Sequence, residues 1–125
     1  MLEIVAQIGN PMMIRAYRDF MPGQIVKLVR TPNDVYCSLS NSSQPFGIVI
    51  GLPNQFGMIP VLYSSASLIR TDNFESEFEY NMGALVYSSE TGVLTTEKYN
   101  PNSMPIAYVE TELIAGDKVL EIRWI

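Results

Sequence analysis

The feature that most constrains this chain is the close spacing of its turn signals. Glycine, proline, asparagine and aspartate interrupt the sequence repeatedly, so the apolar and β-branched runs between them are short. The clearest example is the stretch 82–96, in which the runs 84–87 and 93–96 flank a small polar loop that ends at Gly92. Two β-prone runs around such a loop predict a hairpin, and glycine best supplies the positive φ that the loop needs.

The same pattern extends along the chain, and no stretch has convincing helical periodicity. It predicts an all-β fold, either a β-sandwich or a small barrel of about ten short antiparallel strands with little helix. We expect residues 1–10 to be an N-terminal strand or arm, and residues 11–125 to form a single all-β domain. The predicted strands cover residues 2–8, 13–17, 24–30, 35–39, 46–52, 58–63, 67–71, 84–87, 93–96, 106–112 and 119–124.

Two residues within these runs carry more specific expectations. Pro60 has no backbone N–H, so it places the run 58–63 at a sheet edge or at a bulge. Cys37 lies in the middle of a predicted strand, where a lone cysteine is typically a small core side chain. No base flanks Cys37 to make it a nucleophile, and a single cysteine cannot form an internal disulfide.

The composition argues against catalysis. The chain contains no histidine, which removes the commonest general base, the Ser-His-Asp arrangement and most zinc sites. Its glycines are isolated turn residues, and none forms a phosphate-binding loop before a helix. We therefore expect no enzymatic activity, no cofactor and no bound metal.

One acidic cluster, Asp72–Tyr80, has the side chains for a metal site or for a pair of catalytic carboxylates. Its glutamates alternate with apolar or small residues. On a strand, carboxylates two residues apart are separated by about 6.6–6.8 Å, which is awkward for sharing one ion. The pattern favours an amphipathic strand with a solvated acidic face.

The net charge of −5 argues against a nucleic-acid partner, which would require a basic footprint. The charge is also uneven. Residues 1–70 hold five basic and three acidic side chains, whereas residues 71–125 hold three basic and ten acidic ones. Halves of opposite sign can complement one another between neighbouring copies, although simple solvated faces would give the same pattern.

The sequence contains no basic-then-apolar leader and no apolar run long enough to cross a bilayer as a helix. We therefore expect a soluble protein that is made in the cytoplasm and has no membrane partner. Charged residues make up only 17% of the chain, so much of the surface is uncharged and suited to packing against neighbours.

Several short stretches give the chain a family resemblance. They are Met21–Val26, Phe46–Val49, Gly83–Tyr87 leading to Gly92–Thr95, Pro105–Val109, and the last strand after Ala115–Asp117. Over about residues 20–125 this order of turns and strands resembles small all-β virion proteins of tailed bacteriophages, especially capsid decoration (cement) proteins.

The resemblance implies a non-enzymatic virion protein that decorates and stabilises the outer surface of a phage head by binding adjacent capsomers. Its partners would be the major capsid protein and further copies of itself, in a homodimer or homotrimer. Two alternatives remain: a tail or head–tail connector component, or a β-barrel that binds a small molecule such as a carbohydrate. For the carbohydrate, Phe78–Tyr80 would supply an exposed aromatic beside carboxylates.

The predicted contacts come from the arm and the basic segment after it. The arm is an apolar strand that Gly9-Asn10-Pro11 uncouples from the rest of the chain, so it must add to a sheet edge in its own subunit or in a neighbour. The resemblance to decoration proteins implies such a contact, because their N-terminal arms often bind the capsid lattice. The predicted interaction residues are Leu2, Ile4, Val5, Ile8, Arg15 and Arg18.

Overall fold

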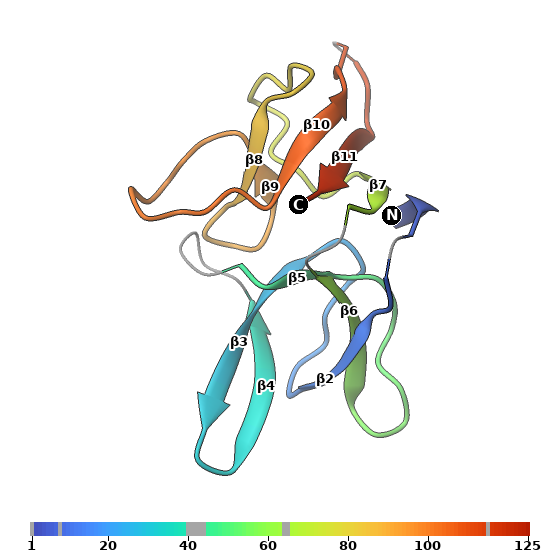
Figure 1. Cartoon of the computed structure of the whole chain (residues 1–125), viewed down its shortest axis with the longest axis vertical. Coiled ribbons are helices and arrows are strands. Elements are labelled where there is room, and N and C mark those ends of the chain that lie inside the picture. The colour runs from blue at the N-terminus through green and yellow to red at the C-terminus, as the bar shows by residue number, and fades with distance from the viewer. Residues whose placement is uncertain (1, 8, 40–44, 64–65, 115) are drawn as a thin grey trace.

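The computed structural model describes residues 2–7, 9–39, 45–63, 66–114 and 116–125. This part of the chain contains eleven strands and no helix, which confirms the all-β prediction. The strands form a closed five-stranded barrel and a six-stranded sheet, which follow one another along the long axis of the molecule (Figure 1). No helix in the described ranges could therefore span a membrane.

The barrel occupies the lower half of Figure 1, and its strands follow the order β2-β4-β3-β5-β6. Their bounds are β2 (Met12–Ala16), β3 (Ile25–Thr31), β4 (Asp34–Leu39), β5 (Gly47–Val49) and β6 (Met58–Tyr63). Four of the neighbouring pairs are antiparallel, as predicted, but β2 and β4 are parallel. A ring with an odd number of strands cannot alternate direction throughout, so closure with five strands requires one parallel pair.

Side chains fill the barrel interior. Inward-facing residues from all five strands pack with Phe20, and the cluster is closed to solvent. A barrel this small has room inside only for its own side chains. Its buried residues are Ile14, Phe20, Val26, Cys37, Val49, Ile59 and Val61.

The position predicted for Pro60 is wrong, because β6 is paired on both sides. It pairs with β2 along one edge and with β5 along the other. The Pro60 carbonyl accepts a hydrogen bond from the Ile50 N–H at 3.1 Å, one residue beyond the end of β5. Proline has no N–H to donate to β5, but β5 has already ended at this point, so no strand hydrogen bond is lost.

The six-stranded sheet forms the upper half of Figure 1, and all its strand pairs are antiparallel. Its order is β1-β7-β11-β10-β8-β9. The bounds are β1 (Leu2–Ala6), β7 (Leu68–Thr71), β8 (Leu85–Ser88), β9 (Leu94–Thr95), β10 (Ala107–Thr111) and β11 (Leu120–Trp124). A second core lies beneath this sheet and includes Ile25, Ile69, Tyr80, Val86, Leu120, Ile122 and Trp124.

The N-terminal strand joins the sheet of its own chain. β1 pairs with β7, with Leu2 opposite Thr71 and Ile4 opposite Ile69. Leu2 and Ile4 are half-buried, whereas Val5 is exposed, and the register shifts between Ile4 and Ala6. The sequence left open whether this strand adds to a sheet in its own subunit or in a neighbour. In the structure it pairs with β7 of its own subunit.

The predicted hairpin is confirmed. β8 and β9 pair antiparallel, with Tyr87 opposite Thr95, and Gly92 in the connecting loop has a φ of 77°. The Ser89 hydroxyl organises this loop by accepting hydrogen bonds from the Thr91 and Val93 N–H groups.

The acidic segment Asp72–Tyr80 is not a strand, so that prediction is wrong. Its only bridge in the described chain is a single parallel contact between Phe74 and Leu94. The Tyr80 hydroxyl then donates to the Glu75 carbonyl at 2.6 Å, which folds the segment back on itself. The alternating pattern arises because Phe74 and Tyr80 point into the core from a loop, not from a paired strand.

Hydrogen bonds tie the barrel to the sheet near the hairpin loop. The Ile25 N–H at the start of β3 donates to the Gly92 carbonyl at 3.0 Å. The Asn73 side-chain amide donates to the Gly23 carbonyl at 2.7 Å and to the Gly92 carbonyl at 3.3 Å. Gly92 and Asn73 therefore hold the two halves of the molecule against each other.

Candidate functional site

Cys37 is a core residue of the barrel, as predicted from its place in a strand. Its side chain is only 2% exposed, and its thiol donates to the Arg15 carbonyl at 3.4 Å. Burial raises the pKa of the Cys37 thiol to about 11, so the nucleophilic thiolate is scarce at neutral pH. This cysteine contributes packing, not chemistry.

Replacing Cys37 with serine tests that role. A serine hydroxyl is more polar, and its shorter bond to Cβ leaves the oxygen farther from the Arg15 carbonyl than the sulfur is. We expect Cys37→Ser to lower the free energy of unfolding by about 1–2 kcal/mol, measured by urea denaturation. An unchanged midpoint would contradict the packing role, and Ser38→Ala on the same strand is the matched control.

The acidic side chains do not gather into a metal site within the described ranges, where no group of three or more metal-ligating side chains is found. The Glu75 carboxylate instead accepts the Tyr99 hydroxyl, with contacts of 2.9 and 3.1 Å. This hydrogen bond to an anion raises the pKa of Tyr99 to about 12. The pair closes the acidic loop against the 97–103 loop.

The structure does not form the carbohydrate platform proposed for Phe78–Tyr80. Tyr80 is only 1% exposed, and burial raises the pKa of its hydroxyl. Phe78 is half-buried against the core of the sheet, so neither ring is a free stacking surface. The reason is the loop described above, which turns the aromatic side chains inward.

The outer face of the sheet carries matched charges. Arg70 on β7 donates to Glu121 on β11 at 2.7 Å, and Arg123 donates to the Glu110 carboxylate at 3.1 Å with two nitrogens. The Glu121 carboxylate also accepts the Thr111 hydroxyl, and these hydrogen bonds hold the pKa of Glu121 below its usual range. Because these charges satisfy one another, this face has little capacity left for an ionic ligand.

The predicted interaction residues do not form one surface. Leu2, Ile4 and Val5 lie on β1 at the edge of the sheet, whereas Arg15 lies on β2 in the barrel. Ile8 lies outside the described residues. The guanidinium of Arg18 stacks on the Phe20 ring, 5.2 Å from its centroid, which gives it a structural contact within the barrel unit.

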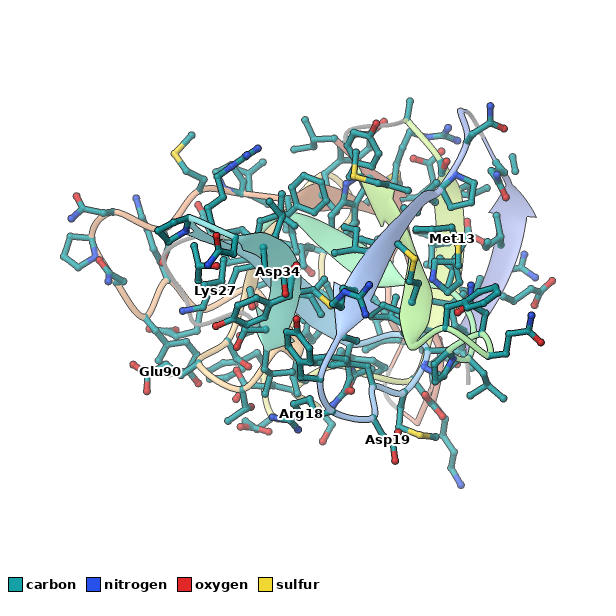
Figure 2. All side chains as sticks on the ribbon, turned by 90° about the horizontal axis from the view of Figure 1, so that it is seen from below. Met13, Arg18, Asp19, Lys27, Asp34 and Glu90 are labelled. Carbon is teal, nitrogen blue, oxygen red and sulfur yellow. The ribbon has the colours of Figure 1, made fainter. Side chains whose placement is uncertain are left out.

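Arg15 borders a hollow on the barrel that the sequence did not reveal. The hollow has a volume of about 510 Å³ and lies between the first half of β2 and the β3–β4 turn. Figure 2 looks at the molecule from the barrel end, with Met13 and Asp34 labelled. We call this hollow the methionine groove; its lining includes Met12, Met13, Val35, Met58, Arg15, Arg30 and Asp34.

A second unusual surface lies on the turns at the far end of the sheet. Met82 is 71% exposed and Ile114 is 69% exposed, although turns normally present polar side chains to solvent. The Leu113 N–H donates to the Tyr80 carbonyl at 3.0 Å, which holds the two turns together. We call this surface the acidic end; it consists of Met82 and Ile114 with the exposed Glu79, Glu112 and Asp117.

Sequence reasoning missed both surfaces, but each left a signal. Met12-Met13 starts a strand directly after a proline, and Met82 directly precedes Gly83 in a turn. Long apolar side chains at such positions cannot all enter a core, since strand ends and turns lie at the surface. Consecutive methionines beside a breaker therefore indicate an adaptable contact surface.

Comparison with known proteins does not assign this chain to a family. No protein-family model matches it, and no curated protein is significantly similar to it.

Proposed function

We propose that the chain is a non-enzymatic structural protein of a tailed-bacteriophage virion, which decorates the outer surface of the head by binding adjacent capsomers. The observation that supports this most strongly is the distribution of exposed apolar side chains. They lie on both the barrel and the sheet, on Met12, Met13, Tyr17, Leu52, Phe56, Leu85, Met104 and Ile114 among others. A subunit that contacts several neighbours in a lattice needs such surfaces on more than one side.

The interior of the molecule supports the same reading. The barrel is filled by its own side chains, and the hollows among the described residues open at the surface. A barrel that encloses a small ligand needs an interior cavity, which requires more or longer strands than these five. Binding through outer surfaces therefore fits this fold better than enclosure of a small molecule.

The proposed partners are the major capsid protein and further copies of the chain. The protein would be made in the host cytoplasm and would act on the assembled shell. Its acidic balance disfavours the packaged DNA as a partner, because phosphate contacts need a basic footprint.

Sedimentation with phage particles tests this proposal. Purified protein is titrated onto heads and, separately, onto tails of the phage whose genome encodes the chain, both lacking the protein. We expect saturable co-sedimentation with heads at a fixed number of copies per capsomer. Binding to tails alone would replace the proposal with the tail or connector alternative, and no binding to either particle would contradict both.

Deleting residues 1–9 tests the contribution of β1. This strand is the last of its sheet and pairs with β7 on one side, so its other edge is open for strand addition within the described structure. Loss of these hydrogen bonds and of Leu2 packing should lower the free energy of unfolding by about 2–4 kcal/mol. The truncated protein should stay folded at low temperature and bind heads less tightly.

Circular dichroism and head sedimentation of the truncated protein separate the two effects. Normal head binding by the folded, truncated protein would exclude β1 as a capsid contact. Val5→Lys is the matched variant, because Val5 is exposed and a charge there should disturb an added strand while sparing the core.

A further inference from the structure

The methionine groove combines apolar and basic groups. Met12, Met13 and Val35 are about two-fifths exposed, at 39%, 42% and 39%. Arg15 lies 4.0 Å from Asp34, which also accepts the Tyr17 hydroxyl. Arg30, in contrast, has no acidic partner anywhere in the described part of the chain. The groove therefore has an unmatched positive charge beside an apolar floor.

The acidic end has the opposite combination. Met82 and Ile114 project from their turns, and the carboxylates of Glu79 and Glu112 pair with no cation among the described residues. Lys118 is the only basic side chain close to it in sequence, and Arg70, which lines one hollow with Glu112 and Asp117, is hydrogen-bonded to Glu121. This end therefore has apolar knobs surrounded by unmatched negative charge.

The two surfaces lie on different halves of an elongated molecule. In Figure 1 residues 81–84, 113–114 and 116–117 lie at the upper end, while the barrel that bears the groove forms the lower half. The charge of the whole molecule follows the same division. The barrel segment, residues 12–63, holds four basic and two acidic side chains, and the sheet strands with their connections hold four basic and eleven acidic ones.

We propose that copies of this chain associate head to tail, with the acidic end of one copy docked in the methionine groove of the next. Ile114 or Met82 would enter the groove, while Glu112 and Glu79 approach Arg30. Methionine side chains suit this role because they are flexible and can mould around an inserted apolar group. This contact uses two different patches, so it is heterologous and generates rings or chains, not a two-fold dimer.

A second copy is the occupant that the charges favour. A groove with a spare arginine selects an apolar segment flanked by carboxylates, and the chain itself displays one at its other end. This proposal can fail independently of the proposed binding to the phage shell, because self-association in solution is measured without any capsid protein.

The test uses two variants that change the charge at exposed side chains of one surface each. Met13→Glu/Arg30→Glu disables the groove, and Glu79→Arg/Glu112→Arg disables the acidic end. By analytical ultracentrifugation, wild-type protein should form multimers that grow with concentration, and each variant alone should associate at least about tenfold more weakly. Raising the salt from about 0.1 M to 1 M should also dissociate the wild-type multimers, because it screens exposed charges.

Mixing the two variants gives the sharpest result. The first variant keeps its acidic end and the second keeps its groove, so one productive contact remains between them. An equimolar mixture should therefore regain association and contain the one-to-one heterodimer, whereas each variant alone stays mostly monomeric. Lys27→Glu, on the opposite face of β3 from Arg30, and Glu90→Arg, in the hairpin loop, reverse a charge in the same direction away from the two surfaces, and both controls should behave as wild type.

Three outcomes would overturn the proposal. One is a wild-type protein that remains monomeric at all concentrations and salt levels. Another is a multimer that both double variants form as well as wild type does. The third is a mixture of the two variants that contains no heterodimer although each variant has a native circular dichroism spectrum.

Discussion

Gly92→Val is expected to lower the free energy of unfolding by about 3–5 kcal/mol, because two costs coincide at this residue. Its φ of 77° is strained for a β-branched residue. A Cβ atom here would also lie 2.7 Å from Leu39 Cδ1 and 2.9 Å from the Ile25 carbonyl oxygen. The Ile25 backbone cannot yield easily, since its N–H is hydrogen-bonded to the Gly92 carbonyl.

Gly83→Val is the control that separates strain from collision. Gly83 has a similar φ of 83°, but a Cβ atom there would meet nothing within 4 Å. We therefore expect it to lose only about 1–3 kcal/mol in urea denaturation. Equal losses for the two variants would mean that the close contact between the hairpin loop and the barrel contributes nothing.

The second large effect is expected at Gly47, on β5 in the barrel. A Cβ atom at this residue would lie 2.5 Å from Val61 Cγ1 and 2.6 Å from the Leu62 carbonyl oxygen. Both neighbours belong to β6, which is fixed by pairing on both sides. Gly47→Ala should therefore lower the free energy of unfolding by about 3 kcal/mol or more, although alanine is otherwise a conservative change.

A double-mutant cycle with Val61→Ala tests that explanation. The second change removes the nearest methyl group but leaves the Leu62 carbonyl in place. The double variant should lose clearly less stability than the sum of the two single variants, because they relieve one shared collision. Strict additivity would show that the Gly47 side of β5 is not packed against Val61.

Local features of the fold were predictable from the sequence. The 82–96 hairpin depends on residues within one short stretch, so its strands and the positive φ of Gly92 follow from turn chemistry alone. The strand 58–63 matches β6 residue for residue, since Met58 follows a clear turn and Tyr63 ends the apolar run.

Features that depend on distant partners were not predictable. The segment 72–80 alternates as a strand would, but among the described residues its one bridge to a strand is the single contact of Phe74 with Leu94. Pro60 lacks the backbone N–H that a strand paired on both sides normally uses. It is tolerated because β5 ends at Val49, before it reaches Pro60, and the sequence does not reveal where β5 ends. Barrel closure, with its parallel pair of β2 and β4, is likewise a property of five strands together.

The candidate surfaces also combine a local feature that the sequence reveals with an arrangement that only the fold reveals. Arg15 was singled out from its charge, and it does border the methionine groove. Arg30, Val35 and Met58 come from three other strands, so only the closed barrel brings them beside Arg15. For the acidic end, the excess of acids in residues 71–125 was visible in the sequence, but its clustering around Ile114 and Met82 depends on how two turns meet.

Thermal release of DNA from phage heads tests the central claim, that this protein decorates and stabilises a capsid. Heads lacking the protein are heated with a DNA-binding dye, alone and with increasing amounts of purified protein. We expect the release temperature to rise with added protein and to reach a plateau when the binding sites on the shell are filled. Gly92→Val protein that has been unfolded by prior heating should leave the release temperature unchanged. Heads that bind the native protein yet release their DNA at an unchanged temperature, or that bind none, would contradict the claim.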